Sequence, residues 1–129
     1  MGFSHVVPEL IKKFNEKKNI KVYSHNHTRS FCFIDDAILQ IVKLSLNKKF
    51  CNQIFNIGND KEEIKIMELA KKIIKIKNSK KKLVKMEITP GSPNRRCPNI
   101  SKIKKLIKLK KFINLSNGLK QTINWYEKI

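Results

Sequence analysis

The stretch of sequence that decides the fold reads Thr28-Arg29-Ser30-Phe31-Cys32-Phe33-Ile34-Asp35-Asp36. Aromatic and β-branched side chains gather between Ser30 and Ile34, and this composition predicts a short strand. The two aspartates that follow suit a helix N-terminus, so we expect Asp35 or Asp36 to cap a helix. That helix would carry a stripe on one face, made of Ala37, Ile38, Ile41, Val42, Ser45 and Leu46. A strand that runs directly into an amphipathic helix is typical of an α/β fold.

The same two patterns recur on both sides of this stretch. Apolar residues at helical spacing predict four further helices, over residues 6–18, 66–77, 100–107 and 117–126. Asn99 and Ser116 stand where the N-caps of the last two belong. Short strands are predicted over residues 20–23, 53–57 and 82–88, and Pro and Gly make residues 89–94 a loop. The sequence therefore predicts a small mixed α/β fold with short strands and about five helices.

Size and composition fit one domain over residues 1–129. The mass is 15.1 kDa and hydrophobic residues make up 40% of the chain, which is enough for a core and excludes a disordered tail. No apolar run approaches the ~18 residues of a membrane span, and the first residues lack the basic and apolar regions of a secretory signal. Three widely separated cysteines, Cys32, Cys51 and Cys97, indicate reduced thiols, so we expect a cytoplasmic protein.

The formal net charge of +19 raises the question of a nucleic-acid partner. The basic residues are nearly all Lys, they are spread over every segment, and the chain is equally rich in Ile and Asn. AT-rich codons produce this joint excess in any protein, so nucleic acid is an unlikely partner by composition. A surface that binds nucleic acid or another polyanion stays open as the alternative.

Three arginines stand out in a chain that otherwise uses Lys. Arg29 adjoins a predicted strand, and Arg95 and Arg96 close the predicted loop at 89–94. A guanidinium fork binds phosphate oxygens bidentately, so two such forks that converge would clamp a diphosphate. Tyr23, at a strand end near Arg29, could present its ring to a base or sugar. The alternatives are ordinary surface charges for the arginines and partial core burial for Tyr23.

Other sites find little support. The 4 glycines are not spaced as a phosphate-binding loop, so no cofactor is expected to bind this chain. No catalytic Ser, His and Asp arrangement stands out, and His25 and His27 lack the further spaced ligands of a metal site.

Several motifs, taken together, resemble the C-terminal part of the extended short-chain dehydrogenase/reductases, the NAD-dependent epimerases and dehydratases of nucleotide sugars. These motifs are the run from Thr28 to Asp36, Phe55-Asn56-Ile57-Gly58, Arg95-Arg96-Cys97-Pro98-Asn99-Ile100-Ser101-Lys102 and the closing run from Leu115 to Tyr126. The opening run from Met1 to Ile11 resembles an internal piece of the family chain. The resemblance covers nearly the whole sequence in the right order.

The resemblance implies a site for a nucleotide-diphosphate sugar. It places Tyr23 at the nucleoside, Arg29 and Arg96 at the diphosphate with Arg95 as a neighbour, and Asn56 close to the nucleotide. This agrees with the two guanidinium forks inferred from the residues. The chain departs from the family at Ser24-His25-Asn26-His27, where glycines are usual, and at Asn99, where the family has an aspartate.

The N-terminal Rossmann domain of the family, with its NAD site and its Tyr-x-x-x-Lys pair, is absent from the sequence. The resemblance therefore implies a substrate-binding lobe that is not competent alone, from a truncated, split or mis-started gene. A split gene would encode the Rossmann half separately, as a partner of this chain. Such a lobe should expose one apolar face when it is alone, with marginal stability or self-association.

Overall fold

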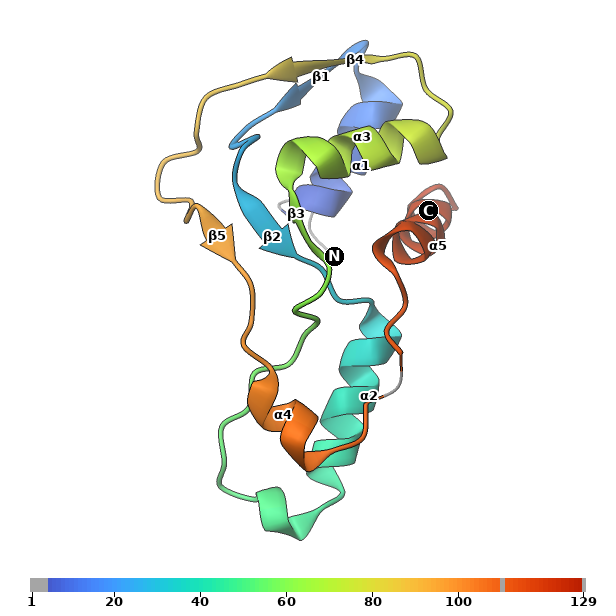
Figure 1. The fold of residues 1–129 in the computed structure, drawn as a ribbon. Coiled ribbons are helices and arrows are strands. Elements are labelled where there is room, and N and C mark those ends of the chain that lie inside the picture. The colour runs from blue at the N-terminus through green and yellow to red at the C-terminus, as the bar shows by residue number, and fades with distance from the viewer. Residues whose placement is uncertain (1–4, 110, 129) are drawn as a thin grey trace.

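Three helices form the main core beneath a two-stranded sheet in this computed structural model, which describes residues 5–109 and 111–128 (Figure 1). The helices are α1 (Val6–Glu16), α3 (Ile66–Ile76) and α5 (Leu115–Tyr126). Each has an apolar stripe at helical spacing, and the three stripes meet in one buried cluster, which includes Leu10, Phe14, Leu69, Ile73 and Leu119. In the sheet, β1 (Asn19–Val22) pairs in parallel with β4 (Lys82–Lys85).

A second sheet lies below this core and has three short strands. β2 (Thr28–Ser30) is central, β3 (Glu63–Lys65) pairs with it in antiparallel fashion, and β5 (Arg95–Arg96) pairs with it in parallel. This sheet joins segments that are far apart in sequence, and it links the upper core to the lower part of the molecule in Figure 1.

The lower part consists of α2 (Ile34–Ser45), the 3-10 turn η1 (Lys48–Phe50) and α4 (Ser101–Leu106). Its small core contains Leu44, Ile100 and Ile103, of which the two isoleucines are fully buried. With five α-helices and short strands in the described part of the chain, the predicted mixed α/β class is confirmed. No helix among residues 5–109 and 111–128 has the length and apolarity to cross a membrane.

The helix predictions are confirmed, but the predicted N-caps are wrong. The residue before α2 is Phe33, and neither Asp35 nor Asp36 caps that helix. Asp36 is buried instead, and its Oδ2 accepts a hydrogen bond from the amide of Ile113 at 2.8 Å. Asn114 rather than Ser116 caps α5. The N-cap of α4 is Ile100 rather than Asn99, although Oδ1 of Asn99 accepts a hydrogen bond from the amide of Ser101 at 3.0 Å.

The strand predictions are less accurate. The strand expected over 30–34 is shifted to Thr28–Ser30, and the one expected over 82–88 ends at Lys85. β3 and β5 were not predicted, because strands of three and two residues are too short to show alternation. Residues 53–57 form no strand and pair with none among the described residues, so the prediction of a strand there is wrong.

The predicted stripe of α2 faces solvent. Ile34, Ile38, Ile41 and Val42 are exposed, as is Leu46 directly after the helix. The residues that α2 buries are Asp36, Gln40 and Leu44. The expectation that one apolar face is exposed is confirmed, and that face lies on α2. The run from Met1 to Ile11 was compared with an internal part of the family chain. Its first four residues, 1–4, lie outside the described residues.

Gly58 packs against Pro98, in the segment that leads into α4, and the space between them is too small for a side chain on Gly58. Its φ is +156°, and a Cβ on it would lie 2.7 Å from Cγ of Pro98. We expect Gly58→Ala to lower the free energy of unfolding by about 1–3 kcal/mol, because two rigid groups would overlap. Urea unfolding measures this change. Gly91→Asn is the control, since Gly91 lies in open space at φ +73° and Asn tolerates that conformation. Equal midpoints for Gly58→Ala and wild type would contradict the prediction.

Candidate nucleotide site

The register of the lower sheet places two arginines side by side. β2 and β5 pair so that Arg29 lies opposite Arg96, while Thr28 lies opposite Arg95. Side chains alternate between the two faces of a strand, so Arg29 and Arg96 project from one face of the sheet. Arg95 projects from the other face. The sheet therefore brings together two of the three arginines that the sequence singled out.

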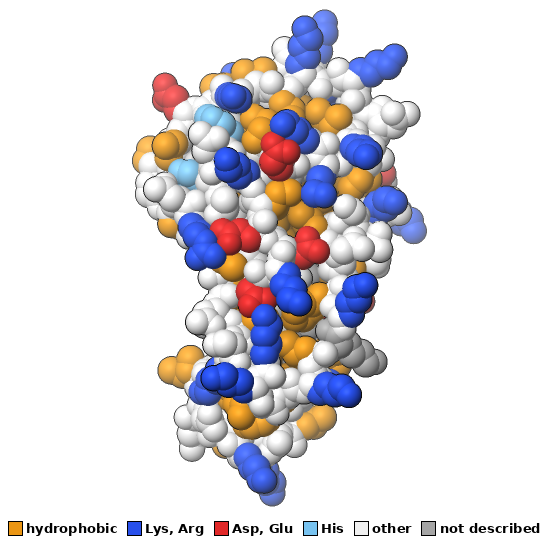
Figure 2. All heavy atoms as spheres, viewed as in Figure 1, with side chains coloured by type: hydrophobic (Ala, Val, Ile, Leu, Met, Phe, Trp, Pro, Cys, Tyr) orange, Lys and Arg blue, Asp and Glu red, His pale blue; other side chains and the backbone are white. Residues whose placement is uncertain are grey.

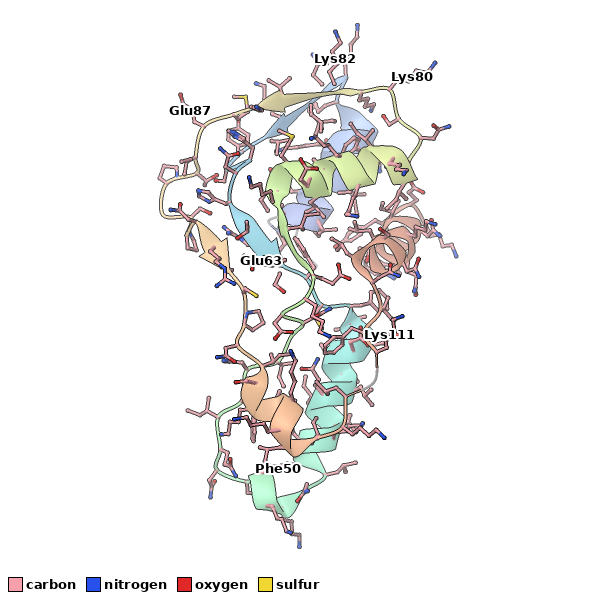
Figure 3. The ribbon with its side chains drawn as sticks, viewed as in Figure 1. Phe50, Glu63, Lys80, Lys82, Glu87 and Lys111 are labelled. Carbon is pink, nitrogen blue, oxygen red and sulfur yellow. The ribbon has the colours of Figure 1, made fainter. Side chains whose placement is uncertain are left out.

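Arg95 forms an ion pair with a carboxylate, that of Glu63, on its own face of the sheet. Its Nε and Nη2 donate to the two oxygens of Glu63, each at 2.8 Å, and Oγ1 of Thr28 donates to Glu63 Oε1 at 2.6 Å. Figure 3 labels Glu63 on β3 in this sheet. The hydrogen bond from Arg95 lowers the pKa of Glu63, the bond from Thr28 adds to this, and the same contact raises the pKa of Arg95. Arg95 thus ties β5 to β3.

Arg29 is held by neutral groups, so its charge stays uncompensated. Nη1 donates to the carbonyl of Thr28 at 2.7 Å, and Nη2 donates to Oγ of Ser92 at 2.8 Å. Burial lowers the pKa of Arg29, and repulsion from Arg96 lowers it further. The guanidinium stays protonated at neutral pH, and the smaller of the two causes, the repulsion from Arg96, reflects a second positive charge nearby. Such a pair favours a bound anion.

A cavity of about 210 Å³ opens beside Arg29. Tyr23 lines it together with Arg29 and Ser92, and its walls are mixed, with apolar residues of α1 and α3 beside the charged residues Glu9, Lys13 and Lys21. The Tyr23 side chain is 43% exposed, which leaves part of its ring free for contact. Nζ of Lys13 lies 5.0 Å from the centre of that ring. The cavity combines a flat aromatic surface with a guanidinium at one side.

Asn56 lies apart from this group of residues. Its Nδ2 donates to the carbonyl of Asn99 at 3.0 Å, beside the start of α4, and it does not line the cavity. Sequence reasoning missed Ser92, which orients Arg29. Ser92 belongs to the loop at 89–94 before Arg95. That position, next to two candidate arginines, was the feature of the sequence that could have indicated its role. Glu63 was missed because β3 was not predicted.

The described glycines do not form a dinucleotide cradle. Gly58 packs on Pro98, Gly118 lies within α5 against Phe33, and Gly91 stands in an open loop. A dinucleotide site of the usual kind needs several glycines at a turn from strand to helix. The residues present therefore do not fit NAD, and no step of a redox reaction is assigned to them.

The basic residues form no single patch on the face seen in Figure 2, where Lys and Arg are scattered from end to end among polar and apolar groups. This distribution agrees with the interpretation that the excess of Lys reflects AT-rich codons rather than a binding surface. The paired arginines of β2 and β5 are distinguished by their geometry rather than by local charge density.

Comparison with known proteins gives one consistent family. Residues 2–58 match the model of the NAD dependent epimerase/dehydratase family. The chain is 34% identical to an uncharacterized protein of Methanocaldococcus jannaschii over 84% of this chain and 33% of that protein. It is 27% identical to a UDP-N-acetyl-alpha-D-glucosaminuronate decarboxylase of Bacillus cytotoxicus over 98% of this chain and 41% of that enzyme.

The fold agrees with that of a solved enzyme. The structure of UDP-glucuronic acid 4-epimerase from Bacillus cereus, in complex with UDP-glucuronic acid and NAD, matches 98% of this chain with a TM-score of 0.87 and 26% identity. The match covers 40% of that enzyme, so the chain spans well under half the length of its relatives. The chain belongs to the NAD-dependent epimerase/dehydratase family of the extended short-chain dehydrogenase/reductases and corresponds to the C-terminal part of its nucleotide-sugar enzymes.

Proposed function

We propose that this chain is the nucleotide-sugar-binding lobe of an epimerase or dehydratase, of the kind that acts on UDP-glucose or dTDP-glucose. Arg29 and Arg96 bind the diphosphate, and Tyr23 contacts the nucleoside. The Rossmann half of the family fold supplies NAD and the catalytic residues, and the lobe alone performs no reaction. The observation that carries the proposal is the pairing of Arg29 with Arg96 on one face of the sheet, with Arg29 at the cavity that Tyr23 lines.

Charge compensation separates the roles of the arginines. Glu63 neutralises Arg95, whereas the contacts of Arg29 are to neutral oxygens. A diphosphate offers two adjacent anionic groups and so matches two adjacent guanidinium forks. Arg95 is proposed as a neighbour that fixes β5, and therefore Arg96, in register. Asn56 is proposed to approach the nucleotide only in the complete enzyme, since its amide is bonded to Asn99 here.

Wild-type protein should bind UDP about tenfold or more tightly than UMP. The second phosphate gives a second guanidinium a charge-assisted hydrogen bond, and such bonds contribute about 1.5–3 kcal/mol. Isothermal titration at fixed ionic strength measures both dissociation constants. Equal affinities for UDP and UMP would contradict the proposed role of Arg29 and Arg96 in binding the diphosphate.

A single-stranded RNA oligonucleotide tests the alternative of a polyanion-binding module. Non-specific binding weakens steeply with salt, because it depends on the release of counterions. If RNA binds and displaces no UDP, the basic surface is separate from the nucleotide site. If RNA binds more tightly than UDP at 150 mM salt (about physiological), the alternative replaces the proposal.

A further inference from the structure

A buried histidine adjoins the proposed nucleotide site, in the turn between β1 and β2. His27 is 4% exposed. Its amide donates to the carbonyl of Ser24 at 2.9 Å, and its carbonyl accepts from the amide of Ile66 at 3.0 Å. The backbone of His27 is therefore fixed on both sides, by the turn itself and by the first residue of α3. The proposed function makes no use of this residue so far.

One nitrogen of the His27 ring has no hydrogen-bond partner. Nε2 is buried and bonds to no residue that the structure describes. Nδ1 lies 3.5 Å from Oγ of Ser92. Burial of an imidazole with an unpaired nitrogen costs free energy, and an apolar side chain would fill the same space without that cost. The contact of Nδ1 with Ser92 is what an apolar residue could not supply.

Ser92 lies between His27 and Arg29. Its Oγ accepts a hydrogen bond from Nη2 of Arg29 at 2.8 Å, and Nδ1 of His27 is the other polar group within its reach among the described residues. A hydroxyl that accepts from a guanidinium is polarised to donate its own hydrogen more strongly. Ser92 therefore donates to Nδ1, and the proton of the neutral ring is on Nε2. The hydrogen bonds run in one direction, from Arg29 to Ser92 to His27.

The loop that carries Ser92 lies beside this turn and is anchored to it (Figure 1). The amide of Thr89 donates to Oγ of Ser24, and the amide of Thr28 donates to the carbonyl of Asn94, each at 2.9 Å. These bonds fix the backbone at the two ends of the loop and leave the direction of the serine hydroxyl open. The imidazole next to that hydroxyl sets its direction.

We propose that His27 is a positioning residue for the diphosphate: through Ser92, it holds the guanidinium of Arg29 in the orientation that binds a phosphate group. His27 does not line the cavity beside Arg29, so its role is indirect. Arg29 also donates to the carbonyl of Thr28, its neighbour in the chain, whereas Ser92 holds it from a distant segment. The inference rests on the proposed function for the identity of the ligand, and on the contacts of three side chains for the rest.

Leucine and asparagine at position 27 form a matched pair, because they are similar in size and shape and differ in one acceptor. Asparagine can place its amide oxygen near the position of Nδ1, and leucine offers no acceptor. His27→Leu should weaken UDP binding about fivefold to tenfold, since one hydrogen bond that orders the site is lost. Its midpoint of urea unfolding should not fall, because no unpaired nitrogen remains buried. His27→Asn should bind UDP nearly as wild type does, and titration calorimetry measures both variants.

His25→Leu is the control for the loss of an imidazole from the same turn. Nδ1 of His25 lies 3.2 Å from the carbonyl of Met86, and no contact among the described residues joins it to Ser92 or Arg29. This variant should bind UDP like wild type. Ser92→Ala removes the middle of the chain of bonds and should weaken UDP binding at least as much as His27→Leu. In the double variant, His27→Leu should cause no further loss, because changes within one chain of bonds are not additive.

NMR of the protein without nucleotide tests the positioning of Arg29 separately from UDP binding. A fixed guanidinium rotates slowly about its Nε–Cζ bond and gives separate signals for its two Nη groups, whereas a free one gives an average. The Arg29 signals should be separate in wild type and in His27→Asn, and averaged in His27→Leu. The nitrogen shifts of the His27 ring should place its proton on Nε2, and Ser92→Ala should change the shift of Nδ1.

Each failure points to a different part of the argument. UDP binding by His27→Leu at the wild-type level would overturn the inference, and equal losses in His27→Leu and His27→Asn would mean that the ring only fills space. If wild type binds no UDP while the Arg29 signals still depend on His27, the nucleotide site is refuted and the positioning of Arg29 is supported. If UDP binds while the Arg29 signals ignore His27, the positioning is refuted and the nucleotide site stands.

Discussion

Arg29→Ala and Arg96→Ala should each weaken UDP binding by about 10- to 100-fold, while Arg95→Ala leaves it within about threefold of wild type. The three arginines are close in space and carry the same charge. They differ in the face of the sheet from which they project and in whether a carboxylate neutralises them. The difference between the variants therefore tests the geometry of the site rather than its charge.

The size of the effect follows from bidentate charge-assisted bonding. Removal of either Arg29 or Arg96 deletes about two such bonds and leaves phosphate oxygens facing a single guanidinium. Arg29→Lys keeps the positive charge and loses the planar fork, so it should fall between wild type and Arg29→Ala. Titration calorimetry with UDP at constant salt measures all four variants, and urea unfolding shows that each one is folded.

Arg95→Ala is the matched control, although it breaks the ion pair with Glu63. That pair is exposed and joins β5 to β3, so its loss should affect the sheet more than the ligand. Equal losses of UDP affinity in all three alanine variants would mean that net charge alone attracts the nucleotide. A large loss of UDP affinity in Arg95→Ala alone would mean that the nucleotide binds on the face of the sheet that carries Arg95.

The sequence predicts elements well where one segment carries its own pattern. α1 and α3 have strong apolar stripes that meet in the core, and both were placed correctly to within about two residues. β2, β3 and β5 behave differently, because each is short and is defined by its neighbours. Arg29 and Arg96 could be named as candidates from residue type and position. Their common face could not, because it depends on a register between segments more than sixty residues apart.

For α2 the prediction fails in a different way: the apolar stripe is strong, but it does not face the core of this chain. Hydrophobic periodicity identifies the face that packs against protein but not which protein. The stripe that includes Ile38 and Ile41 is exposed in this chain. Asp36 and Gln40 are buried because backbone groups satisfy them, and a pattern of apolar residues carries no signal for such contacts. The strand predicted at 53–57 fails for the same reason, since the described chain offers it no neighbour.

Gln40→Leu should lower the free energy of unfolding by about 2–4 kcal/mol. Gln40 is fully buried and bonds both the amide and the carbonyl of Gly58. Leucine fits a similar volume and raises the apolarity of the site, so a count of hydrophobic burial alone would predict stabilisation. The buried amide and carbonyl of Gly58 would instead lose their partners, at about 1–3 kcal/mol for each unsatisfied group. Chemical unfolding of the two proteins decides between these two expectations.

Gln53→Leu is the control, because Gln53 is exposed and its Nε2 donates to the carbonyl of the nearby Lys49 at 2.9 Å. Its stability should change by no more than about 0.5 kcal/mol. A Gln40→Leu variant as stable as Gln53→Leu would mean that Gly58 finds other partners.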